Sequence, residues 1–488
     1  MDVAFLHTPH HITRNPPFQY YLLPMGMIML ANLLNEEGIE SRVFNLGIEF
    51  QKGTSLEKSI STIDAHIFAI DIHWYVHLYD AVTVASMVKK IHPHAYIVIG
   101  GLTASRFARE ILETFQFIDA VIKGDAEIPM LQLVTAFMKG KKEGFHDIPN
   151  IVYRNGSVRE NDLQYVAHRK ELSRLPYVKN PLPVNHEDTF LHREMQGESC
   201  FPTLWFCCAR GCTFNCCWCG GAHMSHEVLT GRHHITVRDP ERVADEVITM
   251  ASRLNTASFS HDLAVLGKKY CTLLFSRIRE ESLDIGCYWE IFDPSLYSED
   301  FLMQIARSFH PQRSKFAVSL GSALPAIREK SGMASFTNTH FVDLLHSMRD
   351  MGFQVEGYFH VLPPETYESM YNTLQFVERI QKELHIPFFY WSPTLDPASP
   401  MQLYPETYGI ISRLHSFSDY WKACSGAPFT GYDLPHFTEE DMISLSTGQS
   451  ASLPESVASL YREVTQQRNS IIGISSDESD LSSEILFI

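Results

Sequence analysis

Two series of short apolar segments, alternating with helical patterns, constrain the fold of this 488-residue chain more than any other feature. The first 125 residues contain five Val- and Ile-rich runs, predicted as strands at 3–9, 41–47, 67–73, 95–101 and 119–124. These runs are almost continuously apolar, as expected for a parallel sheet that helices cover on both faces. Helical patterns separate or follow them, near 24–37, 55–63, 78–92, 103–114 and 128–139. The alternation predicts a doubly wound, flavodoxin-like parallel sheet, whose ligands bind where the carboxyl ends of the strands meet.

A second series begins near Thr203 and contains six more predicted strands, at 203–209, 256–261, 285–293, 315–321, 353–362 and 388–395. Helical patterns lie between them, and six such units within about 200 residues predict a partial (β/α)6 barrel. After residue 405 the pattern becomes mainly helical. The last residues, SSDESDLSSEILFI, are polar and acidic, so we expect them to be disordered.

These patterns predict four segments along the chain. Residues 1–160 form the first α/β domain, which a hairpin turning at Asn155-Gly156 closes. Residues 161–200 contain Pro176, Pro181 and Pro183 and are predicted to be a linker. The partial barrel follows at 201–404, and a helical region with the acidic tail occupies 405–488.

Composition and charge exclude several classes of protein. The formal net charge of −17 argues against a nucleic-acid-binding surface. The longest apolar run, at 23–34, is about half of what a bilayer requires, so we expect no membrane partner. The start, MDVAFLHTP, lacks the basic region of a secretory signal. Seven of the ten cysteines lie between Cys200 and Cys219, which favours a metal site in a reducing, cytoplasmic compartment over a disulfide scaffold.

The segment ARGCTFNCCWCGG (209–221) carries the chemistry, because it places Cys212, Cys216 and Cys219 in a Cys-x3-Cys-x2-Cys loop. Three thiolates suit a [4Fe–4S] cluster and leave one of its irons open to an amine and carboxylate ligand. The alternative is a structural zinc site, with a fourth ligand from Cys200, Cys208 or Cys217. The thiols outside the triad, Cys207 among them, are expected to be packed side chains.

This loop resembles the signature of the radical S-adenosylmethionine superfamily, Cys-x3-Cys-x-aromatic-Cys, with Trp218 as the aromatic residue and Gly220 after the last cysteine. The resemblance implies a cluster that passes one electron to the sulfonium of S-adenosylmethionine. Cleavage then gives methionine and a 5′-deoxyadenosyl radical, which abstracts hydrogen from the substrate. In such enzymes the cofactor carries the hard chemistry, and the protein aims the radical and excludes water.

Other segments of the barrel resemble the same family and imply further contacts to S-adenosylmethionine. GYFHVLPPET (357–366) resembles its fifth-strand segment, although Val361 replaces a glycine, and Gly357 would admit the adenine. VSLGSALPAIREKSG (318–332) resembles its fourth-strand segment. The side chains that this resemblance nominates as cofactor contacts are those of Ser319, Ser322, His261, Asp262 and Glu290. FSHDL (259–263) occupies the place where family members hold the methionine amino group, which makes His261 and Asp262 the candidates for that contact, although the usual Gly-Gly-Glu is absent. A structural role is an equal alternative for each of these side chains.

The N-terminal domain resembles the cobalamin-binding domain that is often fused to such enzymes. The resemblance rests on Gly100-Gly101, which would approach the corrin, and on Gly124 and Glu127 in a Gly-x-x-Glu. The Asp-x-His-x-x-Gly that supplies a cobalt-ligating histidine is absent after the first strand, although His73 is a candidate to face the corrin. The alternative is a domain that has lost its cofactor.

The resemblance implies an enzyme with one [4Fe–4S] cluster, S-adenosylmethionine and cobalamin, because residues 1–199 offer no cysteine for a second cluster. We expect a methyltransferase acting on an unactivated carbon or phosphorus of a small molecule or peptide, with flavodoxin or ferredoxin as electron donor. The alternatives are cyclisation, rearrangement or oxidation without methyl transfer, and a non-catalytic cobalamin- or metal-binding protein. The sequence does not identify the catalytic residues or the substrate.

Overall fold

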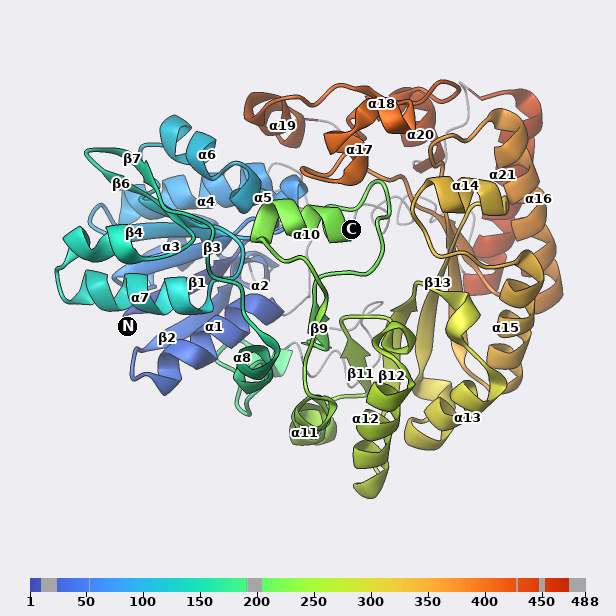
Figure 1. The fold of residues 1–488 in the computed structure, drawn as a ribbon, viewed down its shortest axis with the longest axis horizontal. Coiled ribbons are helices and arrows are strands. Elements are labelled where there is room, and N and C mark those ends of the chain that lie inside the picture. Colours follow the sequence, from blue (N-terminus) through green and yellow to red (C-terminus); the bar gives the residue numbers. More distant parts are fainter. Residues whose placement is uncertain are drawn as a thin grey trace. The chain divides into compact units, whose positions relative to one another are not determined.

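The computed structural model of the chain describes residues 1–9, 24–51, 53–189, 191, 204–426, 429–446 and 453–473 (Figure 1). They form two compact units, and neither is continuous in sequence. The first comprises Met1–Cys212, His223–Arg242 and Ser416–Gly426, and the second comprises Thr213–Ala222, Val243–His415 and Ala427–Ile488. The four predicted segments stay predictions, because these units do not follow their boundaries. The acidic tail lies outside the described residues.

The first unit is built on a seven-stranded sheet of order β2-β1-β3-β4-β5-β6-β7. Its strands are β1 (Val3–His7), β2 (Ser41–Asn45), β3 (Ile67–Asp71), β4 (Tyr96–Gly100), β5 (Ala120–Ile122), β6 (Ile151–Asn155) and β7 (Ser157–Glu160). The first five are parallel, and β6 and β7 form the predicted hairpin as an antiparallel extension. Their apolar runs are buried because helices cover both faces. On one side lie α1 (Met25–Glu36) and α7 (Glu127–Met138), and on the other lie α4 (Leu78–Ile91) and α6 (Ala108–Thr114) (Figure 1).

The helices of the first unit are α1 (Met25–Glu36), α2 (Leu46–Gln51), α3 (Leu56–Ser61), α4 (Leu78–Ile91), α5 (Leu102–Arg106), α6 (Ala108–Thr114), α7 (Glu127–Met138), α8 (Arg169–Arg174), α10 (His223–Thr230) and α19 (Phe417–Cys424). Strand order reverses between β1 and β3, so the ligand-binding edge is expected at the carboxyl ends of these two strands. A two-residue strand, β8 (Trp205–Phe206), and an antiparallel pair, β9 (Ala209–Arg210) with β10 (Thr236–Val237), lead into and out of the cysteine loop.

The second unit contains five parallel strands that pair in chain order, as the predicted βα units require. They are β11 (Thr256–Phe259), β12 (Gly286–Ile291), β13 (Lys315–Gly321), β14 (Gln354–Phe359) and β15 (Phe388–Tyr390). Along one side of these strands run the helices α12 (Lys268–Glu280), α13 (Glu299–Ser308), α15 (Asn338–Asp350) and α16 (Tyr367–Leu384) (Figure 1). The core beneath them is aromatic, since Trp289 is fully buried and its ring meets those of Phe259 and Phe316.

The other helices of this unit follow the strands or close the chain. With those already named, they are α11 (Pro240–Met250), which begins in the first unit, α12 (Lys268–Glu280), α13 (Glu299–Ser308), α14 (Pro325–Lys330), α15 (Asn338–Asp350), α16 (Tyr367–Leu384), α17 (Pro400–Leu403), α18 (Pro405–Tyr408), α20 (Glu439–Ser446) and α21 (Glu455–Ile472). A small antiparallel pair, β16 (Ile411–Ser412) with β17 (Tyr432–Asp433), lies in the C-terminal region. The predicted fold class, a doubly wound sheet followed by a partial barrel and a mainly helical region, is confirmed. No helix in the described segments has the length and hydrophobicity needed to cross a bilayer.

Candidate cofactor site

Exposure distinguishes the predicted triad from most of the other described cysteines. Cys212, Cys216 and Cys219 are each partly exposed, as is Cys424, whereas Cys207, Cys208, Cys217, Cys271 and Cys287 are buried. Burial raises the pKa of Cys217 and of Cys271 to about 12, so both stay protonated at neutral pH. Since the thiolate is the form that binds metal, the buried thiols are poor ligands and the partly exposed triad is a suitable donor set.

The second unit holds the middle of the cysteine loop by its backbone. The Cys217 N–H donates to the Ser331 carbonyl at 2.9 Å, and the Cys217 carbonyl accepts from the Met401 N–H at 2.8 Å. Gly332 has a φ of 71°, and a Cβ there would lie 2.0 Å from the Asn215 carbonyl oxygen. Only glycine therefore fits where the end of α14 meets the loop.

Trp218 and Gly220, on either side of Cys219, are also fixed by the second unit. The Trp218 ring lies 5.4 Å from the His360 ring and 6.3 Å from the Trp391 ring, between centroids. The Gly220 N–H donates to the Asp396 carboxylate at 3.0 Å, and the Gly221 N–H donates to the Cys219 sulfur at 3.3 Å. A backbone donor to sulfur stabilises the thiolate and tunes a cluster bound to it.

Cys212 belongs to the first unit, whereas Cys216 and Cys219 belong to the second. Within the described ranges, no three His, Cys, Asp or Glu side chains lie close enough together to hold a metal ion. The convergence of the three thiolates on one cluster therefore stays a prediction. So does the rejection of a zinc site, because Cys200 lies outside the described residues.

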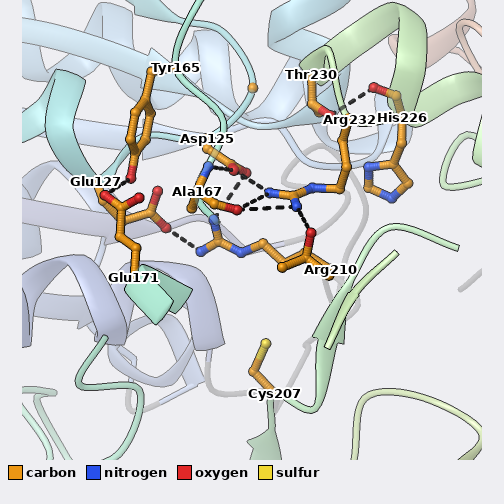
Figure 2. Close-up of polar contacts among 12 residues, drawn as sticks. Asp125, Glu127, Tyr165, Ala167, Glu171, Cys207, Arg210, His226, Thr230 and Arg232 are labelled. Atoms are coloured by element: carbon orange, nitrogen blue, oxygen red, sulfur yellow. Dashed lines mark hydrogen bonds and ion pairs between the residues drawn. The ribbon is translucent and has the colours of Figure 1, made fainter. Parts of the chain in front are cut away.

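An ion-pair network in the first unit holds the strand that precedes Cys212 (Figure 2). Arg210 donates to Asp125 at 3.0 Å and also to Glu127, which is 1% exposed. Arg232 donates to the other oxygen of Asp125 and to the Ala167 carbonyl, and the Ala167 N–H returns a 2.8 Å hydrogen bond to Asp125. The Glu127 of the predicted Gly-x-x-Glu thus opens α7 and pairs with the arginine of the cysteine motif, a role that the sequence pattern does not reveal.

At the carboxyl edge of the first sheet, the predicted glycines have packing roles. Gly101 has a φ of 107°, and a Cβ there would lie 2.5 Å from the Ile72 carbonyl oxygen, so the close approach is to backbone. Gly124 has a φ of 62° and packs against Thr230, while Gly100 ends β4 with more space around it. Contacts of these three glycines to a corrin stay predictions.

His7 and His73 both lie near this edge, and the sequence analysis nominated only His73. His73 is exposed, and its ring meets the edge of Trp74 at 4.7 Å between centroids. His7 ends β1 and is 7% exposed, yet neither ring nitrogen has a hydrogen-bond partner among the described residues, which leave out 10–23; its Nδ1 lies 3.9 Å from Asp71 at the end of β3. A buried imidazole without hydrogen bonds at a ligand-binding edge marks a candidate contact. The segment HTPHHITRN (7–15) contains His7, but nothing in the sequence distinguishes His7 from the two histidines that follow it.

In the second unit, Asp262 is fully buried and satisfied by the protein itself. Its carboxylate accepts hydrogen bonds from the N–H groups of Ala264, Phe292 and Asp293 and from the Tyr297 hydroxyl. Burial nevertheless raises the pKa of Asp262 to about 6. These contacts give Asp262 a structural role. The contact of Asp262 to the methionine amino group stays a prediction. His261 is partly exposed, with Nδ1 3.1 Å from the Ser260 hydroxyl.

The residues predicted from the fourth and fifth strands also differ in burial and in whether protein contacts already satisfy them. Ser322 is fully buried, and its hydroxyl donates to Glu365 at 3.1 Å. A Cβ at Gly357 would lie 2.2 Å from the Phe388 ring, so packing explains this glycine, and an adenine contact stays a prediction. Ser319, in contrast, is partly exposed near the carboxyl end of β13.

Glu290 is the second-last residue of β12. It is exposed and makes no hydrogen bond or ion pair within the described residues. Solvent reaches it, but protein surrounds the carboxyl group, and burial together with the nearby charge of Glu356 raises the pKa of Glu290 to about 7. Of the side chains nominated in the second unit, Glu290 is therefore the exposed one, and Ser319 and His261 are partly exposed.

Comparison with protein families and curated proteins supports this organisation. Residues 17–134 match the B12 binding domain. An uncharacterized methyltransferase of Pyrococcus horikoshii is 25% identical over 434 residues, which cover 86% of this chain and 85% of that protein. The anaerobic magnesium-protoporphyrin IX monomethyl ester cyclase of Rubrivivax gelatinosus is 22% identical over 219 residues, covering 44% of this chain and 36% of the cyclase.

Two solved enzymes share the fold over nearly the whole chain. The radical S-adenosylmethionine methyltransferase TsrM of Kitasatospora setae, solved with cobalamin and a [4Fe–4S] cluster, gives a TM-score of 0.67 at 15% identity, covering 95% of this chain and 85% of TsrM. The cobalamin-dependent S-adenosylmethionine radical enzyme OxsB gives a TM-score of 0.64 at 12% identity, covering 97% of this chain and 72% of OxsB. The predicted resemblance is thereby confirmed for the N-terminal domain and for the fold as a whole.

Proposed function

We propose that this chain is a cobalamin-dependent radical S-adenosylmethionine enzyme, and that it is a methyltransferase. The observation that carries the proposal is the cysteine loop: three partly exposed thiols in Cys-x3-Cys-x2-Cys spacing, in a chain whose other described thiols are mostly buried. The TsrM-like fold and the match to the B12 binding domain support the same assignment.

By residue type and exposure, the three cysteines of the loop suit a [4Fe–4S] cluster. Cys212, Cys216 and Cys219 would hold it, and such a cluster, when bound, supplies the electron that cleaves S-adenosylmethionine. The chain contributes the Gly221 N–H, which donates to the Cys219 sulfur, and the Trp218 ring, which packs beside the loop on His360. The hydrogen bonds of Cys217 to Ser331 and Met401 keep the middle of the loop in place.

The carboxyl edge of the first sheet fits cobalamin, which when bound supplies the transferable methyl group. His7 carries the structural support, because it is buried there and neither ring nitrogen forms a hydrogen bond with a residue that the structure describes. We propose that His7 and Asp71 contact the corrin or its substituents and that Gly100 allows the backbone to approach it. His73 is a further contact at the same edge.

The substrate proposed here is a small molecule or a peptide with an unactivated carbon or phosphorus centre. The support is a likeness of fold, since TsrM has been solved with tryptophan as substrate and a S-adenosylmethionine analogue. We expect a flavodoxin or ferredoxin as electron donor and a cytoplasmic location. The relative from Rubrivivax gelatinosus is a cyclase, which keeps reactions without methyl transfer as the alternative.

The experiment needs no knowledge of the substrate. Full-length protein is purified without oxygen, loaded with iron, sulfide and cobalamin, reduced, and mixed with S-adenosylmethionine carrying a 13CD3 methyl group. The proposal predicts that the extracted cobalamin gains the labelled methyl and that 5′-deoxyadenosine is formed. A protein that binds no cobalamin contradicts the cobalamin assignment, and 5′-deoxyadenosine without label on cobalamin favours the cyclase-like alternative.

Cys216→Ala and Cys271→Ala form a matched pair of variants for this experiment. Both remove one thiol, but Cys271 is buried and its sulfur donates to the Leu263 carbonyl at 3.0 Å. We expect Cys216→Ala to lose the cluster and all 5′-deoxyadenosine, and Cys271→Ala to retain both. Equal activity of the two variants would favour a non-catalytic or zinc-binding protein.

A further inference from the structure

The second sheet has one apolar face and one polar face, and the strand register defines both. Glu290 on β12 aligns with Ala317 on β13, and Ala317 aligns with Glu356 on β14. Aligned residues of neighbouring parallel strands point to the same side, so the two glutamates flank Ala317 on one face. Trp289 and Phe316 lie on the opposite face, fully buried in the aromatic core.

One of the two glutamates is fully paired. Glu356 accepts a 2.6 Å ion pair from Lys315 Nζ through one oxygen and a 3.0 Å hydrogen bond from the Tyr358 hydroxyl through the other. Lys315 and Tyr358 lie two positions from Ala317 and Glu356 along their strands, so they share the polar face. The side chain of Glu356 is 8% exposed, which is consistent with a satisfied, structural carboxylate.

Glu290 has no counterpart to Lys315. It is exposed and makes no hydrogen bond or ion pair with the described residues. The polar face therefore carries two carboxylates and one ammonium, which leaves one negative charge uncompensated. A positive ligand group beside Glu290 would remove the repulsion between Glu290 and Glu356.

A second group on this face also lacks a partner. Ser258 on β11 aligns with Tyr288, which is two positions before Glu290 and therefore on its side of the sheet. Ser258 is fully buried, and its hydroxyl has no hydrogen-bond partner in the part of the chain that the structure describes. Buried hydroxyls are rarely left without a partner, so this one points to a polar ligand group that completes it.

The position of Glu290 also suits a contact to a ligand. Glu290 lies one residue before the carboxyl end of β12, and barrel enzymes bind substrate at the carboxyl ends of their strands. Ala317 and Glu356 are buried, so Glu290 is the exposed carboxylate of the polar face.

We propose that the polar face of Ser258, Glu290, Lys315 and Glu356 binds a protonated primary amine of a ligand, with Glu290 as its direct partner. This rests on the proposed function and adds a ligand chemistry to it. The amine belongs either to the methionine part of S-adenosylmethionine or to the substrate. Asp262 is already satisfied by four protein donors, so Glu290 is the better carboxylate for this role.

The first test uses binding and needs no turnover. Full-length, cluster-loaded protein is titrated calorimetrically with S-adenosylhomocysteine, which carries the amine, and with 5′-methylthioadenosine, which does not. If the cofactor supplies the amine, Glu290→Gln weakens S-adenosylhomocysteine by about 10- to 100-fold, as expected for loss of a charged hydrogen bond. The affinity for 5′-methylthioadenosine stays within twofold. The control Glu383→Gln replaces an exposed glutamate and leaves both affinities unchanged.

The second test addresses an amine on the substrate, with 2-phenylethylamine and the neutral 2-phenylethanol as probes, each in the presence of S-adenosylhomocysteine. If the substrate supplies the amine, Glu290→Gln weakens only 2-phenylethylamine. Unchanged affinity for both amine-bearing probes overturns the proposal. If wild-type protein binds neither adenosyl compound, the proposed function fails, and the phenylethylamine result still decides the amine site. Circular dichroism confirms that the variants are folded.

Discussion

Two groups of charged side chains, one in each unit, differ in how far their charges are compensated. In the first unit, Asp125 and Glu127 face Arg210 and Arg232, so two negative and two positive charges cancel in a largely buried network (Figure 2). On the polar face of the second sheet, Lys315 compensates only one of two glutamates. The difference indicates that the first group stabilises the fold, whereas the second is arranged to receive a ligand.

The largest effect is expected in the compensated network. Arg232→Met leaves part of the negative charge of Asp125 unpaired, and breaking a buried ion pair costs about 3–5 kcal/mol in the free energy of unfolding. Urea denaturation followed by circular dichroism measures the loss. The control Arg349→Met removes an exposed arginine paired with Asp350 and is expected to cost less than about 1 kcal/mol.

The double variant Arg232→Met with Asp125→Asn sharpens this comparison. Neutralising Asp125 removes the charge that the first substitution left unpaired, so the double variant is expected to be more stable than Arg232→Met alone. Equal stability of Arg232→Met and Arg349→Met would contradict the structural role of the network.

Burial without an opposite charge favours the neutral form of an ionisable group. His360 is such a group and extends the comparison to a histidine. It is 3% exposed, its Nδ1 lies 3.0 Å from the Trp391 carbonyl, and burial lowers its pKa to about 4. The unfolded chain binds a proton at His360 below pH 6.5 and the folded chain does not. Stability therefore falls as the pH drops from 6.5 to 4, by at most about 3 kcal/mol.

His360→Gln is expected to lose this part of the acid sensitivity and to retain a donor for the Trp391 carbonyl. Thermal unfolding at pH 7 and pH 5 measures the difference, with His436→Gln, an exposed position, as the control. If wild type and His360→Gln lose stability equally on acidification, His360 is not held neutral by the fold.

Gly332→Ala is expected to have an intermediate effect. The Cβ would meet the Asn215 carbonyl oxygen at 2.0 Å, and the residue has a positive φ, so the substitution costs about 1–3 kcal/mol and displaces the cysteine loop. We expect reduced iron content after reconstitution. Gly352→Ala has a similar φ of 83° but a nearest neighbour at 3.9 Å, so it should bind iron normally. Equal iron content in both variants would contradict the contact.

The smallest effect is expected at Glu290. Because its carboxylate has no partner among the described residues, Glu290→Gln should change the free energy of unfolding by less than about 0.5 kcal/mol. Chemical denaturation of the unliganded protein measures this change. A loss comparable to that of Arg232→Met would show that Glu290 is structural and would remove the contrast between the two groups.

The sequence predicted the parts of this molecule that local patterns determine. Continuous Val and Ile runs indicated the parallel strands, and the spacing of three cysteines indicated a metal loop. Contacts between distant residues left no such pattern. Arg210 meets Asp125 across 85 residues, and Gly332 meets Asn215 because α14 ends there. Helix α19, from the C-terminal region of the chain, likewise belongs to the first unit, where Tyr420 packs on Tyr75 and Phe107.

The candidate site was predictable to the same extent. Its residue types were visible, but whether a polar side chain is free or satisfied depends on the folded structure. Asp262 and Ser322 were selected as cofactor contacts and prove to be occupied by Tyr297 and Glu365. His7 was not selected, because its burial without hydrogen bonds arises only when β1 and β3 lie side by side.

The central claim is that three cysteines hold one [4Fe–4S] cluster whose fourth iron is open to S-adenosylmethionine. Metal and sulfide analysis, combined with electron paramagnetic resonance of the anaerobically reduced protein before and after adding S-adenosylmethionine, tests it most directly. The account predicts about four irons and four sulfides per chain and a signal that changes on addition. Protein that contains zinc without iron or sulfide, or a cluster signal that does not respond to S-adenosylmethionine, would contradict it.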